Sequence, residues 1–93
     1  MIERTSMELF IYLIRRIDFV GYDNYSAAVV VAESEDVARL IRPDGNTWDE
    51  AANPEIEVRW ARSPDQINVT FVGIVKNDDL ISGDIILASY NAG

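Results

Sequence analysis

The chain of 93 residues contains neither cysteine nor histidine. The absence of cysteine excludes a disulfide framework, a thiolate nucleophile and a zinc–cysteine site. The absence of histidine removes the commonest general base and a frequent transition-metal ligand. Carboxylate, tyrosine, lysine or arginine chemistry remains open to an enzyme, but with so much chemistry missing we expect a non-enzymatic protein without a cofactor.

Positive charge is scarce as well, with 8 basic against 16 acidic residues and a net charge of −8. Such a field repels nucleic acid and anionic membrane surfaces, so we expect neither as a direct partner. It suits a basic protein partner, or it serves only to keep the chain in solution. Residues 1–7 are polar, and the apolar run after them is too short to span a bilayer, so we expect a cytoplasmic location.

Unbroken apolar runs are the most informative feature that is present: Leu9–Ile14, Ala27–Ala32 and Ile85–Ala88. Side chains alternate across a strand, so such a run makes both faces of a sheet apolar. The pattern predicts strands over residues 8–17, 26–32, 67–75 and 84–90. Residues 55–61 alternate apolar and charged side chains, which predicts an edge strand or an extended arm.

Only one helix is well specified. Ser34 is a predicted N-cap, Glu35 can pair with Arg39 one turn later, and Pro43 ends the helix. Capping-box spacing predicts single helical turns after Thr47 and after Ser63.

The predicted fold class is α+β: an antiparallel sheet of four or five strands with one short helix packed on one face. We expect a flexible N-terminal extension over residues 1–7 and a single domain over 8–93. One short helix cannot cover two apolar faces. The sequence therefore predicts a homo-oligomer, a dimer or larger, in which another copy supplies the missing cover.

Candidate partner-binding residues come from the aromatic and basic side chains. The loop between the first two strands carries Tyr22, Asp23 and Tyr25, whose rings suit a protein interface or a nucleotide base, or else cover the end of the core. Trp48 and Trp60 are each a candidate interface anchor if partly exposed; otherwise they fill the core, which is the role that we favour for Trp60. A positive patch for a small phosphorylated ligand would form if the strand that carries Arg15 and Arg16 lies beside the segment that carries Arg59 and Arg62.

Clustered carboxylates have two interpretations. Asp44, Asn46, Asp49 and Glu50 surround Gly45, but their spacing is not that of an EF-hand. We interpret them as capping and turn residues, with a weak Ca²⁺ or Mg²⁺ site as the alternative. Asp78 and Asp79 are interpreted as solvated turn residues rather than as paired catalytic acids.

Several segments resemble a group of small phage- and prophage-encoded proteins. The resemblance lies in the Tyr12–Arg16 strand, the Gly21–Tyr25 loop, the stretches Val29–Glu35 and Ala38–Arg39 and the ending Gly83–Gly93, and it leaves out residues 44–62. It brings no activity and no site residues with it. What it implies is a phage accessory gene, a class that often encodes inhibitors of bacterial immunity.

The leading hypothesis is a non-enzymatic phage protein that binds and inhibits a bacterial defence component. One alternative is an oligomeric sponge that sequesters a small nucleotide signal between subunits through Tyr22, Tyr25 and arginines. Another alternative is a structural or assembly component of a phage particle.

Overall fold

The structure is a computed structural model that describes residues 8–18, 24–75 and 80–91. Its elements follow in the order β1 (Phe10–Arg16), β2 (Asn24–Ala32), α1 (Glu35–Arg39), α2 (Trp48–Ala51), η1 (a 3-10 turn, Pro64–Gln66), β3 (Ile67–Ile74) and β4 (Ile85–Asn91). The expected extension over residues 1–7 lies outside the described residues.

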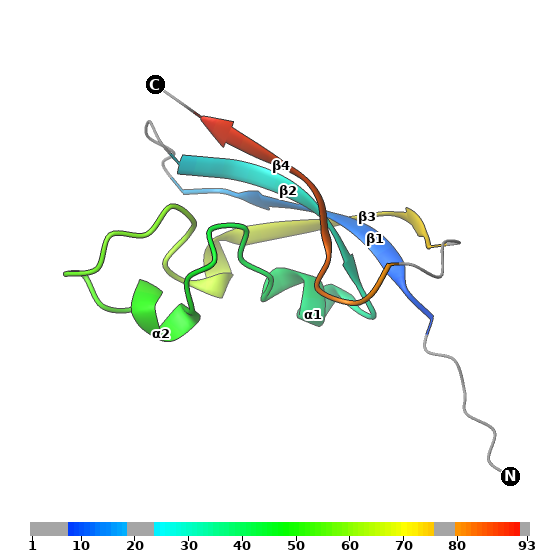
Figure 1. Cartoon of the computed structure of the whole chain (residues 1–93), viewed down its shortest axis with the longest axis horizontal. Helices are drawn as coiled ribbons and strands as arrows, with labels where there is room; N and C mark the ends of the chain where they lie inside the picture. The colour runs from blue at the N-terminus through cyan, green and yellow to red at the C-terminus, as the bar shows by residue number, and fades with distance from the viewer. Residues whose placement is uncertain (1–7, 19–23, 76–79, 92–93) are drawn as a thin grey trace, which may run out of the picture.

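The four strands form one antiparallel sheet in the order β3-β1-β2-β4 (Figure 1). β1 lies inside the sheet, with Ile14 opposite Ala28 of β2 and opposite Val69 of β3. Bulges interrupt the register of β1 with β3 and of β2 with β4. The α+β class and the antiparallel sheet are confirmed.

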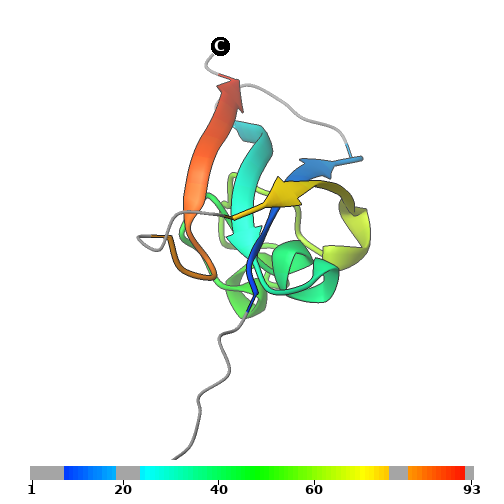
Figure 2. The same ribbon diagram turned by 90° about the vertical axis from the view of Figure 1, so that its right-hand side faces the viewer.

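One face of the sheet carries the core. Tyr12, Ile14, Ala28 and Val30 point to the same side, because paired residues share a face and alternate residues repeat it. Ala38 of α1 packs on them, together with Trp60 from the connecting segment. α1, α2 and η1 lie on this side of the sheet, as Figures 1 and 2 show from two directions.

The helices begin where the capping residues predict. The Ser34 hydroxyl accepts a hydrogen bond from the backbone N–H of Val37, and the Thr47 hydroxyl accepts one from Glu50 in a complete capping box. α1 has 5 residues and α2 has 4, so packing on the sheet stabilises them more than their own hydrogen bonds do.

Of the two alternatives for residues 55–61, the edge strand is wrong, because the segment has no regular secondary structure. The described part of the sheet has the order β3-β1-β2-β4 and does not include the segment, although the backbone N–H of Tyr25 donates to the carbonyl of Arg59 (2.9 Å). The predicted alternation of burial is still present, since Val58 and Trp60 are buried while Glu57 and Arg59 are exposed.

The other face of the sheet, which we call the open face, is apolar. No helix in the described part of the chain covers it (Figure 1). Leu13 lies opposite Val29, and Val29 lies opposite Leu87, so the three share this face. The Leu87 side chain is 66% exposed, and a shallow hollow of about 100 Å³ lies between these three residues, Ala27 and Ser89. The runs in β1, β2 and β4 thus make both faces apolar, as predicted.

Candidate functional site

A buried ion pair holds the segment that builds the site. This segment, residues 52–63 between α2 and η1, has no helix or strand, and we call it the irregular segment. The carboxylate of Asp44 accepts hydrogen bonds from Arg42, the shorter at 2.8 Å, and from the backbone N–H of Arg59 (3.0 Å). Arg42 also donates to the carbonyl of Ala61 (2.6 Å) and lies over the Trp48 ring, with its guanidinium carbon 4.3 Å from the ring centroid. The chain on both sides of Trp60 is therefore fixed to the end of α1.

Arg62 fixes the remaining part of the segment. Its guanidinium donates to the backbone carbonyls of Ala51 and Asn53 (both 3.1 Å) and of Ile56 (2.9 Å). These bonds replace the ladder hydrogen bonds that an irregular segment lacks.

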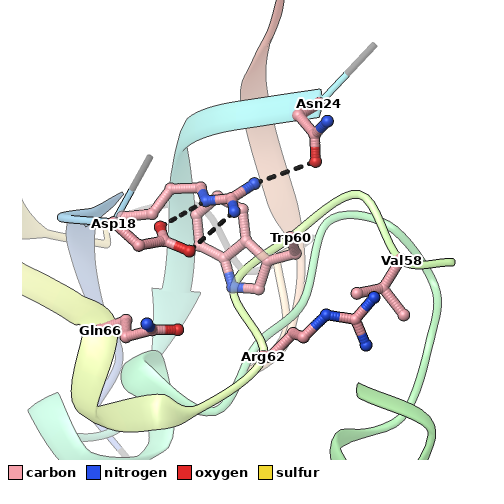
Figure 3. Close-up of a pocket in the computed structure, with 7 residues that line it drawn as sticks. Asp18, Asn24, Val58, Trp60, Arg62 and Gln66 are labelled. Atoms are coloured by element: carbon pink, nitrogen blue, oxygen red, sulfur yellow. Dashed lines mark hydrogen bonds and ion pairs between the residues drawn. The ribbon is translucent and has the colours of Figure 1, made fainter. Parts of the chain in front are cut away.

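A cavity of about 310 Å³ opens between this segment and the end of β1. Its walls are Arg16, Asp18, Asn24, Val58, Trp60, Arg62 and Gln66, as Figure 3 shows. The residues come from β1, β2, the irregular segment and η1, so the cavity exists only in the folded chain. Its volume is at the lower end of the range of about 300–1,000 Å³ typical of small-molecule sites.

Arg16 and Asp18 form an ion pair along one wall, with Nε of Arg16 2.7 Å from a carboxylate oxygen. The same guanidinium donates to the side-chain oxygen of Asn24 (3.2 Å) and to the carbonyl of Tyr25 (3.3 Å). Most of the positive charge of this wall is thus balanced by Asp18, and a phosphate would compete with that carboxylate.

Two polar atoms at the cavity have no hydrogen-bond partner: Nε1 of Trp60 and Oε1 of Gln66. Both atoms are buried, and the Trp60 side chain as a whole is only 1% exposed. Leaving one such group unpaired costs about 1–3 kcal/mol. By contrast, Nε1 of Trp48 donates to the carbonyl of Leu40 (2.9 Å). Two residues that line the cavity thus carry an unpaired donor and an unpaired acceptor, which makes the cavity a candidate ligand-binding site.

The structure brings together only part of the predicted site. Arg16 and Arg62 line the same cavity, and the Arg59 carbonyl accepts from Arg16 at 3.5 Å. Arg15 lies on the open face, opposite Ala27 and Asn68, so it is separated from Arg16 by the sheet. Trp48 is half-buried beside α1, and Tyr25 packs against the core.

Tyr22 and Asp23 lie outside the described residues, as do Asp78 and Asp79. Sequence reasoning missed Gln66 as a site residue and favoured the core over a binding role for Trp60. Gln66 is the only glutamine of the chain, which draws attention to it but does not by itself indicate a site.

The carboxylates around Gly45 serve the turn and the cap. Asp44 accepts from the Asn46 backbone N–H (3.0 Å), and Glu50 accepts from the N–H of Thr47 (2.9 Å) and from the Asn46 amide (3.0 Å). These are the capping and turn roles that we inferred from the sequence. Over residues 8–18, 24–75 and 80–91 there is no group of three or more acidic side chains placed to hold a metal ion.

No family model, curated protein or solved structure matches this chain. The resemblance to phage-encoded proteins therefore stays a prediction. None of the helices in the described ranges is long and apolar enough to cross a membrane.

Proposed function

We propose that this protein is a non-enzymatic binding protein in which the open face joins two copies and the opposite, acidic side of each copy binds a host protein. The observation that carries the proposal is the separation of charge from apolar surface. The four strands contain no acidic residue, and their only charged residues are Arg15 and Arg16. Residues 33–65, which form the layer on the other side, contain nine carboxylates and four arginines.

A second copy is the partner that suits the open face. Two molecules that each carry a net charge of −8 repel one another, and they associate most easily where neither presents a carboxylate. The open face meets that condition, and its exposed Leu87 and half-buried Leu13 supply apolar area to bury.

The acidic side favours a partner with a basic surface. Exposed carboxylates occur along its length, at Glu35 and Asp36 of α1, at Asp49 of α2, and at Glu55 and Glu57 of the irregular segment. Because the resemblance implies a phage accessory gene, the partner that we propose is a component of bacterial anti-phage defence.

Expression of the full chain in a host with active immunity tests the proposal. We expect restored plaque formation by a restricted phage, and copurification of an identified defence protein that dissociates at raised ionic strength. The triple variant Asp49→Asn, Glu55→Gln and Glu57→Gln should lose both effects, because it removes three exposed charges. Glu8→Gln, an exposed carboxylate just before β1, serves as the control and should keep both effects. Unchanged immunity with no defence protein recovered would contradict the proposal.

A further inference from the structure

The unpaired donor and acceptor belong to two residues that line the cavity. Figure 3 shows the Gln66 side chain extending towards the indole of Trp60. The Nε1–H of Trp60 needs an acceptor, and the Oε1 of Gln66 needs a donor. The two atoms do not bond to each other in the structure. A ligand that satisfies both must present an acceptor beside a donor.

The charged side chains of the cavity already have hydrogen-bond partners. The guanidinium of Arg16 is paired with Asp18, and that of Arg62 donates to three backbone carbonyls. An anion at Arg16 would have to displace the Asp18 carboxylate, whereas a neutral polar ligand would not.

We propose that this cavity binds a small planar ligand with an amide-type edge, in which a carbonyl oxygen stands next to an N–H. The carbonyl accepts from Nε1 of Trp60, and the N–H donates to Oε1 of Gln66. Lactams and nucleobases such as uracil carry this edge. The site is independent of the proposed protein partner, although a nucleobase ligand would also support the alternative of a nucleotide sponge.

Access depends on Gln66. Both unpaired atoms are out of contact with solvent. In our proposal the Gln66 side chain turns to admit the ligand. Gln66 is partly exposed at the end of η1, and its backbone is anchored by bonds to Ser63 (3.0 Å) and Ile17 (2.8 Å). The side chain can therefore rotate while the backbone stays in place.

Two-dimensional ¹⁵N NMR of the full chain tests the site, because its two tryptophans give two indole N–H signals. The Trp48→Phe variant assigns the remaining signal to Trp60. Titration with uracil should shift the Trp60 signal saturably and leave that of Trp48 unchanged. The matched ligand 1,3-dimethyluracil has no N–H, so it should bind at least tenfold more weakly.

The variant Gln66→Met keeps the length of the side chain but removes the acceptor. We expect it to reduce the preference for uracil over 1,3-dimethyluracil to nearly none. Equal responses of the original chain to the two ligands would overturn the proposal. So would an unmoved Trp60 signal with both uracil and 2-pyrrolidinone, the result expected if Gln66 and Trp60 bond directly to each other in solution. The ligand comparison is made on the original chain, and a variant is used only to assign the Trp60 signal.

Discussion

At the scale of single residues, the Asp44 carboxylate combines near-complete burial with a full set of partners. Its side chain is 1% exposed, that of Arg42 is 3% exposed, and backbone N–H groups of Asn46 and Arg59 complete its hydrogen bonds. Removal of one partner from a buried ion pair leaves the other charge uncompensated.

Asp44→Ala should therefore lower the free energy of unfolding by about 3–5 kcal/mol, measured by urea denaturation. The control is Asp49→Ala, an exposed position in α2, which should change stability by no more than about 0.5 kcal/mol. Equal effects of the two substitutions would show that the buried Arg42–Asp44 pair contributes no more to the free energy of unfolding than an exposed carboxylate does.

The pH dependence of stability follows from the same residue. Burial raises the pKa of Asp44, but hydrogen bonds from Arg42, Asn46 and Arg59 and the charge of Arg42 outweigh it and hold the pKa below the ordinary 3.8. A depressed carboxylate pKa stabilises the fold above the unfolded-state pKa, and this contribution is lost as the pH falls through the folded-state pKa. Glu50 acts in the same direction, because bonds from Thr47 and Asn46 lower its pKa below 4.5.

We expect the thermal midpoint to fall as the pH drops below about 5, and the fall to be shallower in Asp44→Asn. Calorimetry across the acid range measures both slopes. Parallel slopes for the original chain and the variant would exclude Asp44 as a source of the pH dependence.

At the scale of elements, α1 depends on its cap because it is so short. Ser34→Ala removes the hydroxyl that accepts from Val37 (3.2 Å) and should cost about 1 kcal/mol of stability. Ser34→Asn keeps a capping oxygen and should stay within a few tenths of a kcal/mol of the original chain. Chemical denaturation of the three proteins measures the difference, and a full loss in the asparagine variant would contradict the capping role.

Local patterns predicted most of the elements. Apolar runs located β1, β2 and β4, and the spacing of Thr47 and Glu50 located α2, because these signals act between residues close in sequence. Residues 55–61 show where such reasoning fails. Their alternation indicates which side chains are buried, but a strand also needs a ladder of hydrogen bonds to a neighbouring strand, and the described sheet does not include this segment.

The candidate cavity could be predicted only in part. Arg16 and Arg62 were placed together as a patch on the condition that their segments are neighbours, and that condition depends on how the chain folds back after α2. Gln66 and Trp60 meet because η1 and the irregular segment pack beside β1. No periodicity connects the two positions, so their unpaired atoms become visible only in the structure.

At the scale of the whole molecule, the open face should determine the oligomeric state. Leu87→Lys places a charge on that face and should convert the assembly to monomers in sedimentation velocity. Leu40→Lys is a matched control, because Leu40 follows α1 on the other side of the sheet and is 54% exposed, close to the 66% of Leu87. A monomeric original chain at high concentration would contradict the expected pairing.

Within the described residues, the uneven placement of charged side chains contributes an electric dipole moment to each subunit. Its negative end lies in the layer formed by residues 33–65, and Arg15 lies on the opposite face of the sheet. Such a dipole turns an approaching cationic molecule towards the negative end before contact, so the association rate falls as ions in solution screen the field. In a pair joined face to face, the two moments point in opposite directions and nearly cancel, which leaves an assembly that presents negative potential on both outer sides.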